Sequence, residues 1–260
     1  WHPATFASQA VAARSYAVVQ HLNRRNTSHY DLDDGPSSQM FLGDVTLDVA
    51  HRAVAETGGV ILSWKDTVVP AYYCSCCGGF AATAKDGISS SSQHNTAPLE
   101  GRSGRDICTS LDIHKWDASR SLRTFRRRLN ASSTKLNTPE LASIRSIKAI
   151  EPTSTNRHGR PTSIEIIDRR NKSVEIHARQ FVRAANASVS SLPPATPTIW
   201  SSFVSGEKNG AAIKFSGVGM GHGVGLCQFG AQALAGEGRG FEEILSWYYP
   251  QVSFSTLQSS

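Results

Sequence analysis

The stretch 217–231, GVGMGHGVGLCQFGA, constrains the fold more than any other part of this sequence, because six of its fifteen residues are glycine. Glycine is placed where the backbone needs a positive φ or where another group approaches closely. The first half is therefore predicted to be a tight loop whose backbone is exposed to another group. From Leu226 onward the sequence becomes LCQFGAQALAG, which favours a helix.

A glycine-rich loop that runs into a helix offers free N–H groups and the positive end of the helix dipole. This arrangement suits an anionic or carbonyl-rich ligand. The pattern also fits a tight turn between a strand and a helix, in which His222 is purely structural. It is neither a Walker motif, since no Gly-Lys-Ser/Thr follows, nor a dinucleotide fingerprint.

The charge of the chain favours an anionic partner. With a net charge of +6 and a pI of about 9.2, nucleic acid, an acidic polysaccharide and the cell wall all qualify. The basic residues are scattered, apart from 124–130 (TFRRRLN), which is predicted to be the solvated face of a helix. Because no platform of aromatic and basic residues is present, nucleic acid is not the expected partner.

The order of predicted elements indicates an α+β fold of mixed helices and antiparallel strands. Helices are predicted over 3–23, 46–57, 117–129, 178–186 and 240–250, and strands over 60–64, 67–75, 162–168 and 173–178. The β-rich pattern from 144 onward predicts a smaller subdomain over 140–200. The first helix carries Arg14 in its middle, where a buried guanidinium would need a partner.

No run of eighteen apolar residues occurs, so no membrane-spanning helix is expected. The chain begins at Trp1 without a methionine, which predicts a domain cut from a longer protein. A membrane anchor is therefore expected only upstream of this chain.

Three of the five cysteines, Cys74, Cys76 and Cys77, lie within four residues, and Cys108 and Cys227 follow far along the chain. Neighbouring cysteines rarely bridge each other, because a disulfide needs a particular Cα spacing. Each can instead pair with a distant cysteine, or the thiolates can join a histidine around a soft metal ion.

Three stretches together resemble one family. QAVAARSYAV at 9–18, YYCSCCGG at 72–79 and the long block at 217–250 resemble the stage II sporulation protein D family, which includes amidase-enhancer-like cell-wall proteins. QMFLGD at 39–44 also matches a family loop. The resemblance implies one domain over 1–260, truncated at its N-terminus, with two lobes around a glycan-binding cleft.

It also implies an extracytoplasmic peptidoglycan lytic transglycosylase, which cleaves the MurNAc–GlcNAc bond of glycan strands without stem peptides and leaves 1,6-anhydroMurNAc ends. Such an enzyme needs a single carboxyl group, which protonates the leaving oxygen and then takes the proton of the sugar's own 6-hydroxyl. No cofactor is required. The alternative is a non-catalytic amidase enhancer that binds the glycan and presents it to a cell-wall amidase.

This sequence departs from the family at its start. The family's catalytic Glu lies a few residues before the position of Trp1, and its lysine in the first helix falls near Ala7. The chain as it stands is therefore expected to be inactive.

The resemblance assigns site residues by position. Arg14 would orient the acid or hold a sugar substituent, His222 would bond to the catalytic Glu or a sugar hydroxyl, and Gln228 would bind an N-acetyl group. Ser75 and, on a poorer match, Asp106 complete the catalytic candidates. The substrate-binding candidates are Gly221, Gly223, Gln39 and Tyr73.

The family also suggests a role for the cysteines, because some members bind zinc near this turn. Cys74, Cys77 and Cys108 are therefore candidate zinc ligands, with His114 as a fourth. A Cys77–Cys108 disulfide, which suits an oxidising envelope, is the favoured alternative. Cys227 is expected to be a small buried residue.

Overall fold

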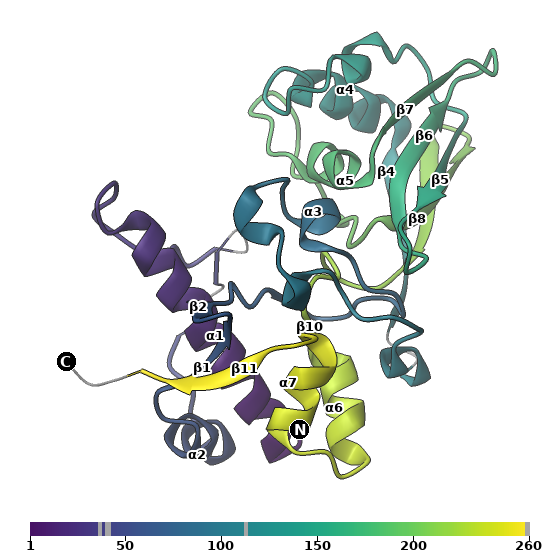
Figure 1. Cartoon of the computed structure of the whole chain (residues 1–260). Coiled ribbons are helices and arrows are strands. Elements are labelled where there is room, and N and C mark those ends of the chain that lie inside the picture. Colours follow the sequence, from purple (N-terminus) through teal and green to yellow (C-terminus); the bar gives the residue numbers. More distant parts are fainter. Residues whose placement is uncertain (36–37, 40–42, 112–113, 258–260) are drawn as a thin grey trace.

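The computed structural model describes residues 1–35, 38–39, 43–111 and 114–257, and it confirms the α+β fold (Figure 1). The helices are α1 Pro3–Arg24, α2 Asp48–Glu56, α3 Ala84–Gly87, α4 Leu122–Ser132, α5 Ala178–Asn186, α6 Gln228–Gly236 and α7 Phe241–Tyr248. Short 3₁₀ turns are η1 Ser92–His94, η2 Ala97–Leu99, η3 Ile107–Ser110 and η5 Pro139–Ser143. The strands are β1 Val60–Trp64, β2 Thr67–Val68, β3 Tyr73–Cys74, β4 Lys115–Ser121, β5 Ala149–Thr155, β6 Pro161–Ile167, β7 Ser173–His177, β8 Phe203–Asn209, β9 Ala212–Val218, β10 Leu226–Cys227 and β11 Ser253–Thr256.

One unit joins the two ends of the sequence. Helix α1 starts with Pro3 in its first turn, where the missing N–H costs nothing, and buries Val11, Ala12 and Val19. It packs against α6, α7 and β1, and β1 lies between β11 and β2 in an antiparallel sheet. Since apolar residues from both ends share one core, neither end can form this core alone.

The second unit is a six-stranded sheet in the order β4-β9-β8-β5-β6-β7, in which every neighbouring pair is antiparallel. Helices α4 and α5 pack on it, and Phe125 of α4 contacts Phe181 of α5 and Phe215 of β9 edge-to-face. The range 140–200, where the sequence predicts a smaller subdomain, supplies β5, β6 and β7. The other three strands lie outside it.

Two predicted elements are wrong in detail. The predicted helix over 117–129 is a strand up to Ser121, whose side chain then accepts a hydrogen bond from Thr124 N and caps α4. The burial of Ala118 and Arg120 alternates with exposed residues, which is the strand period. The predicted strand 67–75 is interrupted around Pro70, which has no N–H for a ladder, and becomes β2 and β3.

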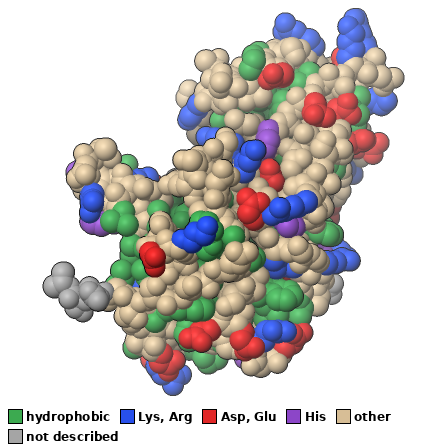
Figure 2. All heavy atoms as spheres, in the orientation of Figure 1, with side chains coloured by type: hydrophobic (Ala, Val, Ile, Leu, Met, Phe, Trp, Pro, Cys, Tyr) green, Lys and Arg blue, Asp and Glu red, His purple; other side chains and the backbone are tan. Residues whose placement is uncertain are grey.

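Basic and acidic side chains are interspersed on the face shown in Figure 2, over both units. None of the helices that the structure describes has the length and apolar character that a membrane crossing needs.

Candidate functional site

The glycine-rich loop lies against the cysteine turn 74–79. Cys76 and Met220 exchange backbone hydrogen bonds of 3.0 and 2.8 Å, and β10 pairs with β3 in parallel. A Cβ on Gly221 would come within 2.7 Å of the Cβ of Cys74. The glycines therefore allow two backbone segments to pack closely, which is a different use from the exposed backbone that the sequence predicts.

The N–H groups at the start of α6 are also used internally. Phe229 N donates to the Ser75 carbonyl at 3.1 Å, and Gly230 N donates to Cys227 Sγ at 3.4 Å. Leu226 N donates to the Tyr72 carbonyl. These donors are not available for the anionic ligand that the sequence predicts at this helix end, because each already has an acceptor.

His222 is half-buried, and its Nδ1 accepts a hydrogen bond from Val224 N at 3.0 Å. Desolvation and the nearby positive charge of Arg160 lower its pKa to about 4, partly opposed by a backbone hydrogen bond with Tyr73. The imidazole is therefore neutral at pH 7. Since Nδ1 is an acceptor, the proton of the neutral ring is assigned to Nε2.

Arg160, which the sequence analysis passed over within a turn-like segment, holds this loop in place. Its guanidinium donates to the carbonyls of Cys77 at 2.6 Å, Phe80 at 3.3 Å and Gly221 at 2.8 Å. The residue is 3% exposed, and burial lowers the pKa of its guanidinium. Because Arg160 directly precedes β6, it ties the second unit to both the cysteine turn and the glycine-rich loop.

A pocket of about 440 Å³ lies between the two units. His222 and Gly221 line it from the glycine-rich loop, and Asp86 from α3. From the second unit come Arg160, Arg179, Arg183, Asn156 and the segment 200–202. Apart from His222 and Gly221, sequence spacing gave no signal for the members of this group, since they are brought together only by the packing of the two units.

A second histidine, His94, was also missed. Its Nε2 and the Tyr72 hydroxyl are 2.8 Å apart, and its Nδ1 lies 2.9 Å from the Ser89 carbonyl. The Tyr72 ring in turn contacts the rings of Tyr16 and His222 edge-on. Burial raises the pKa of Tyr72 to about 12, so its hydroxyl stays protonated and can donate.

Gln228 and Ser75 lie beside the start of the chain. Gln228 Nε2 donates to Gln9 Oε1 at 3.1 Å, and the exposed Ser75 accepts from Phe229 through its carbonyl. The ring of Trp1 contacts that of Phe229 edge-on at 5.1 Å. The start of α6 is thus joined to α1 and to the turn after β3, and Trp1 packs on the same end of α6.

Arg14, Gln39 and Tyr73 each contact another part of the chain. The Arg14 guanidinium donates to the Val60 carbonyl at 2.7 Å, which ties α1 to β1. Gln39 Nε2 donates to the Ala13 carbonyl at 2.9 Å, and the next three residues of its loop, 40–42, lie outside the described residues. Tyr73 pairs with Leu226 across β3 and β10, and burial raises its pKa to about 12.

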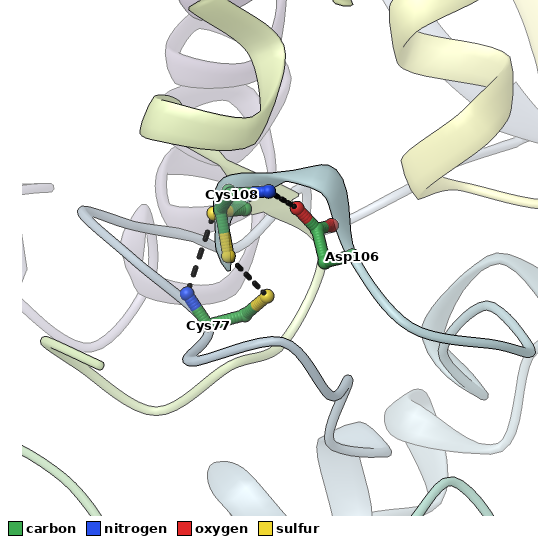
Figure 3. Close-up of side chains that lie close together, drawn as sticks. Cys77, Asp106 and Cys108 are labelled. Atoms are coloured by element: carbon green, nitrogen blue, oxygen red, sulfur yellow. Dashed lines mark hydrogen bonds between the residues drawn. The ribbon is translucent and has the colours of Figure 1, made fainter. Parts of the chain in front are cut away.

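The structure places Asp106 in a buried cluster with three cysteines (Figure 3). One potential ligand atom from each of Cys77, Asp106, Cys108 and Cys227 lies within 4.8 Å of the others. The Asp106 carboxylate accepts from Arg102 Nε at 3.0 Å and from Cys108 N at 2.8 Å. Burial raises its pKa, but the bound Arg102 opposes this shift.

All five cysteines are free thiols, each within the described residues. Cys77 Sγ lies 3.6 Å from Cys108 Sγ, too far for a disulfide bond of about 2.05 Å. Hydrogen bonds from the thiols of Cys108 and Cys227 lower the pKa of Cys77, and they lower that of Cys76 to about 3. Burial is the main cause that raises the pKa of Cys74 and Cys227.

This donor set fits a zinc ion, because thiolates about 2.3 Å from a tetrahedral zinc lie somewhat under 4 Å apart. The Cys77–Cys108 separation agrees with that geometry. Cys74 and His114, which the sequence analysis included, are not in the group, and Cys227 and Asp106 take their places. Cys74 lies instead against Gly221, and His114 Nδ1 is 2.6 Å from the Leu111 carbonyl.

Comparisons with known proteins match different family models to the start and to the middle of the chain. A family model described as Stage II sporulation protein matches residues 1–64. A relative from Bacillus subtilis (strain 168) called amidase enhancer is 24% identical over 284 residues, which cover 98% of this chain. The chain belongs to a stage II sporulation protein D-like family. A second model, Domain of unknown function (DUF8618), matches residues 89–225, more than half of the chain, so it belongs to that family as well.

A further relative of this sporulation-protein-like chain is an uncharacterized protein of Brachyspira hyodysenteriae (strain ATCC 49526 / WA1), 27% identical over 260 residues and 97% of the chain. The chain spans 61% of that protein's length and 38% of the amidase enhancer's. The DUF8618 match begins after β3 and ends at Gly225, so it includes the whole six-stranded sheet and most of the glycine-rich loop.

Proposed function

We propose that this chain is the glycan-binding domain of a peptidoglycan lytic transglycosylase located outside the cytoplasm. Membership of the family indicates a role related to the cell wall. The observation that supports the finer assignment is the pocket between the units, in which a neutral imidazole, an amide and cationic side chains adjoin the loop that carries the family resemblance. Such groups suit hydroxyl, N-acetyl and carboxylate substituents of a glycan.

The general acid of this reaction is, in our proposal, a glutamate a few residues before Trp1. Trp1 packs beside Phe229, whose N–H donates to the Ser75 carbonyl and whose neighbour Gln228 donates to Gln9. Within the described residues, the carboxyl groups of Asp86 and Asp106 do not suit the role. Asp86 accepts from Asn156 Nδ2 at 3.3 Å and partly opposes the lowering of the Arg179 pKa by desolvation and Arg183, and Asp106 is buried against Arg102.

The reaction then follows from one carboxyl group. In its protonated form it donates to the glycosidic oxygen as the MurNAc–GlcNAc bond breaks. As a carboxylate it accepts the proton of the muramic acid 6-hydroxyl, whose oxygen bonds to C1 and closes the 1,6-anhydro ring. The amides of Gln9 and Gln228 would orient the N-acetyl groups during both steps.

The test compares residues 1–260 with the same domain preceded by its native residues, both incubated with glycan strands freed of stem peptides. We expect both to co-sediment with the strands, and only the longer form to release 1,6-anhydroMurNAc ends, detected by mass spectrometry. Changing the preceding glutamate to glutamine should abolish release and leave binding unchanged. Binding without release by the longer form would refute the transglycosylase assignment.

A non-catalytic role is the second candidate, because the named relative is called an amidase enhancer and the described pocket offers no suitable acid. In that case the longer form binds glycan, releases no anhydro ends and raises the rate at which a cell-wall amidase removes stem peptides from the same strands.

A further inference from the structure

The pocket between the units contains a partly exposed arginine, Arg179, two of whose guanidinium nitrogens are buried and lack acceptors. The Nε and Nη1 atoms of Arg179, on the first turn of α5, are buried and have no hydrogen-bond partner among the described residues. A buried charged donor without an acceptor is costly, so such a group calls for an explanation.

Two buried arginines of the second unit, Arg120 and Arg128, show what a satisfied guanidinium looks like here. Arg120 donates to carbonyls of Ala185, Ala195 and Pro197, and Arg128 to those of Ala187 and Pro193. The same fold therefore supplies backbone acceptors where an arginine is structural, and none to these two atoms of Arg179.

The charges around Arg179 leave the pocket positive. Arg160 and Arg183 line the same pocket, His222 is neutral, and Asp86 is the single carboxylate in its lining. Within the part of the chain that the structure describes, Asp86 forms no ion pair with Arg179, because their charged atoms are more than 4.0 Å apart. One carboxylate against three guanidinium groups leaves positive charge for an anionic ligand to neutralise.

The pocket also offers a flat apolar surface. Trp200 lines it and is 47% exposed, while its backbone is fixed by a 2.8 Å hydrogen bond from Gly221 N to its carbonyl. An aromatic face of this kind packs against the C–H face of a sugar ring, and the volume of about 440 Å³ is that of a small-molecule site.

We infer that Arg179, Arg183 and Trp200 form a subsite for a sugar ring that bears a carboxylate. The two guanidinium groups bind the carboxylate, since the planar fork of arginine matches its two oxygens, and Trp200 packs on the ring. This inference deepens the proposed function and rests on it for the choice of N-acetylmuramic acid as the probe. Its residues come from α5 and the segment before β8, which lie outside the stretches that carry the resemblance.

The test measures binding of N-acetylmuramic acid to residues 1–260 by NMR shift titration. N-acetylglucosamine has the same ring without the lactyl carboxylate, and N-acetylglucosamine 6-phosphate offers a phosphate instead. We expect the muramic acid to bind most tightly, and Arg179→Gln and Arg183→Gln each to weaken its binding about tenfold. Trp200→Ala should weaken binding of all three sugars.

Arg52→Gln serves as the matched control, because it removes the same charge from an exposed helical position on α2. Far-ultraviolet circular dichroism checks that each variant is folded. Equal binding of the muramic acid and N-acetylglucosamine, or unchanged binding in folded Arg179→Gln, would overturn the subsite, and tighter binding of the phosphate sugar would overturn its assignment to a carboxylate. The titration measures binding and not cleavage. If the longer form releases anhydro ends but residues 1–260 do not bind the muramic acid, only the subsite is refuted, and the proposed function stands.

Discussion

At the scale of single residues, Arg160 sets the behaviour of the candidate site. It fixes the glycine-rich loop through the Gly221 carbonyl and the cysteine turn through the Cys77 carbonyl. Its charge also helps to keep His222 neutral. An imidazole held neutral can donate through one nitrogen at pH 7, whereas an imidazolium in the same place would repel the cations of the pocket.

The lowered pKa of His222 predicts a dependence of stability on pH. Between its native pKa of about 4 and the ordinary value of 6.5, the unfolded chain binds a proton that the native chain does not. The stability that the neutral His222 contributes is therefore fully present above pH 6.5 and is lost as the pH falls toward 4. We therefore expect the free energy of unfolding, measured with urea, to fall between about pH 7 and about pH 4 in both proteins. The fall should be smaller in His222→Gln than in the parent, by on the order of 2 kcal/mol. The same loss in both proteins would contradict the prediction.

At the scale of elements, the glycine-rich loop is a packing device that joins β9 to β10 and α6. Gly225 has a φ of +66°, and a Cβ there would overlap the carbonyl oxygen of Tyr72 and the ring of Tyr249. The predicted tight loop is thus present, but the groups that approach its backbone belong to the protein itself: Tyr72 and Tyr249 at Gly225, and the cysteine turn at Gly221.

Gly225→Ala is expected to destabilise the fold strongly, and Gly210→Ala is its matched control. Gly210, in the turn between β8 and β9, has a similar φ of +60°, with nothing within 4 Å of its Cβ position. Both variants lose about 1 kcal/mol through backbone strain, and only Gly225→Ala adds overlap, for a total of about 3 kcal/mol or more. Chemical denaturation measures the difference, and equal losses would show that the close packing does not matter.

The cysteine cluster joins the turn after β3, η3 and the N-cap of α6. If zinc binds there, protein purified without chelator should hold one equivalent by plasma mass spectrometry, and Cys227→Ser should reduce it about tenfold or more. Cys74→Ser should retain it, because Cys74 lies outside the group. A metal-free protein with three reactive thiols, two fewer than the five cysteines, would instead indicate the Cys77–Cys108 disulfide.

At the scale of the whole molecule, two units with separate cores meet at the pocket. The first core combines the ends of the sequence and the second lies between the six-stranded sheet, α4 and α5. Positive charge is spread over both units, in agreement with the interspersed charges of Figure 2, so long-range attraction acts on an extended anionic polymer more than on a point ligand.

This charge predicts that salt weakens binding to an acidic glycan. Co-sedimentation with strands that carry free lactyl carboxylates should fall severalfold between about 50 mM and about 500 mM salt, because screening shortens the range of the attraction. Binding to a neutral chitin oligosaccharide is the control and should change little. An equal response of both ligands would argue against an electrostatic contribution.

Local patterns by themselves determined the elements and the family. The predicted bounds of α1, β1 and α5 agree with the structure within a residue or two. Helix α1 has a clear apolar period, and β1 is an apolar run closed by the Lys65-Asp66 turn. Motifs at 9–18, 72–79 and 217–250 gave the family, since they are long enough to be specific. The α4 start was misjudged because the alternation of 115–121 is short and mostly polar.

Only the tertiary structure decided which side chains meet. Arg160, Arg179, His94 and Trp200 carry no signal in sequence, because a site between two units is formed by residues that are far apart in the chain. The same packing moved Asp106 from a catalytic candidate to the cysteine cluster and bound Arg14 to Val60. The glycines in the sequence predict that another group packs closely against the loop. The fold determines that this group is the cysteine turn, and that the loop also lines the pocket.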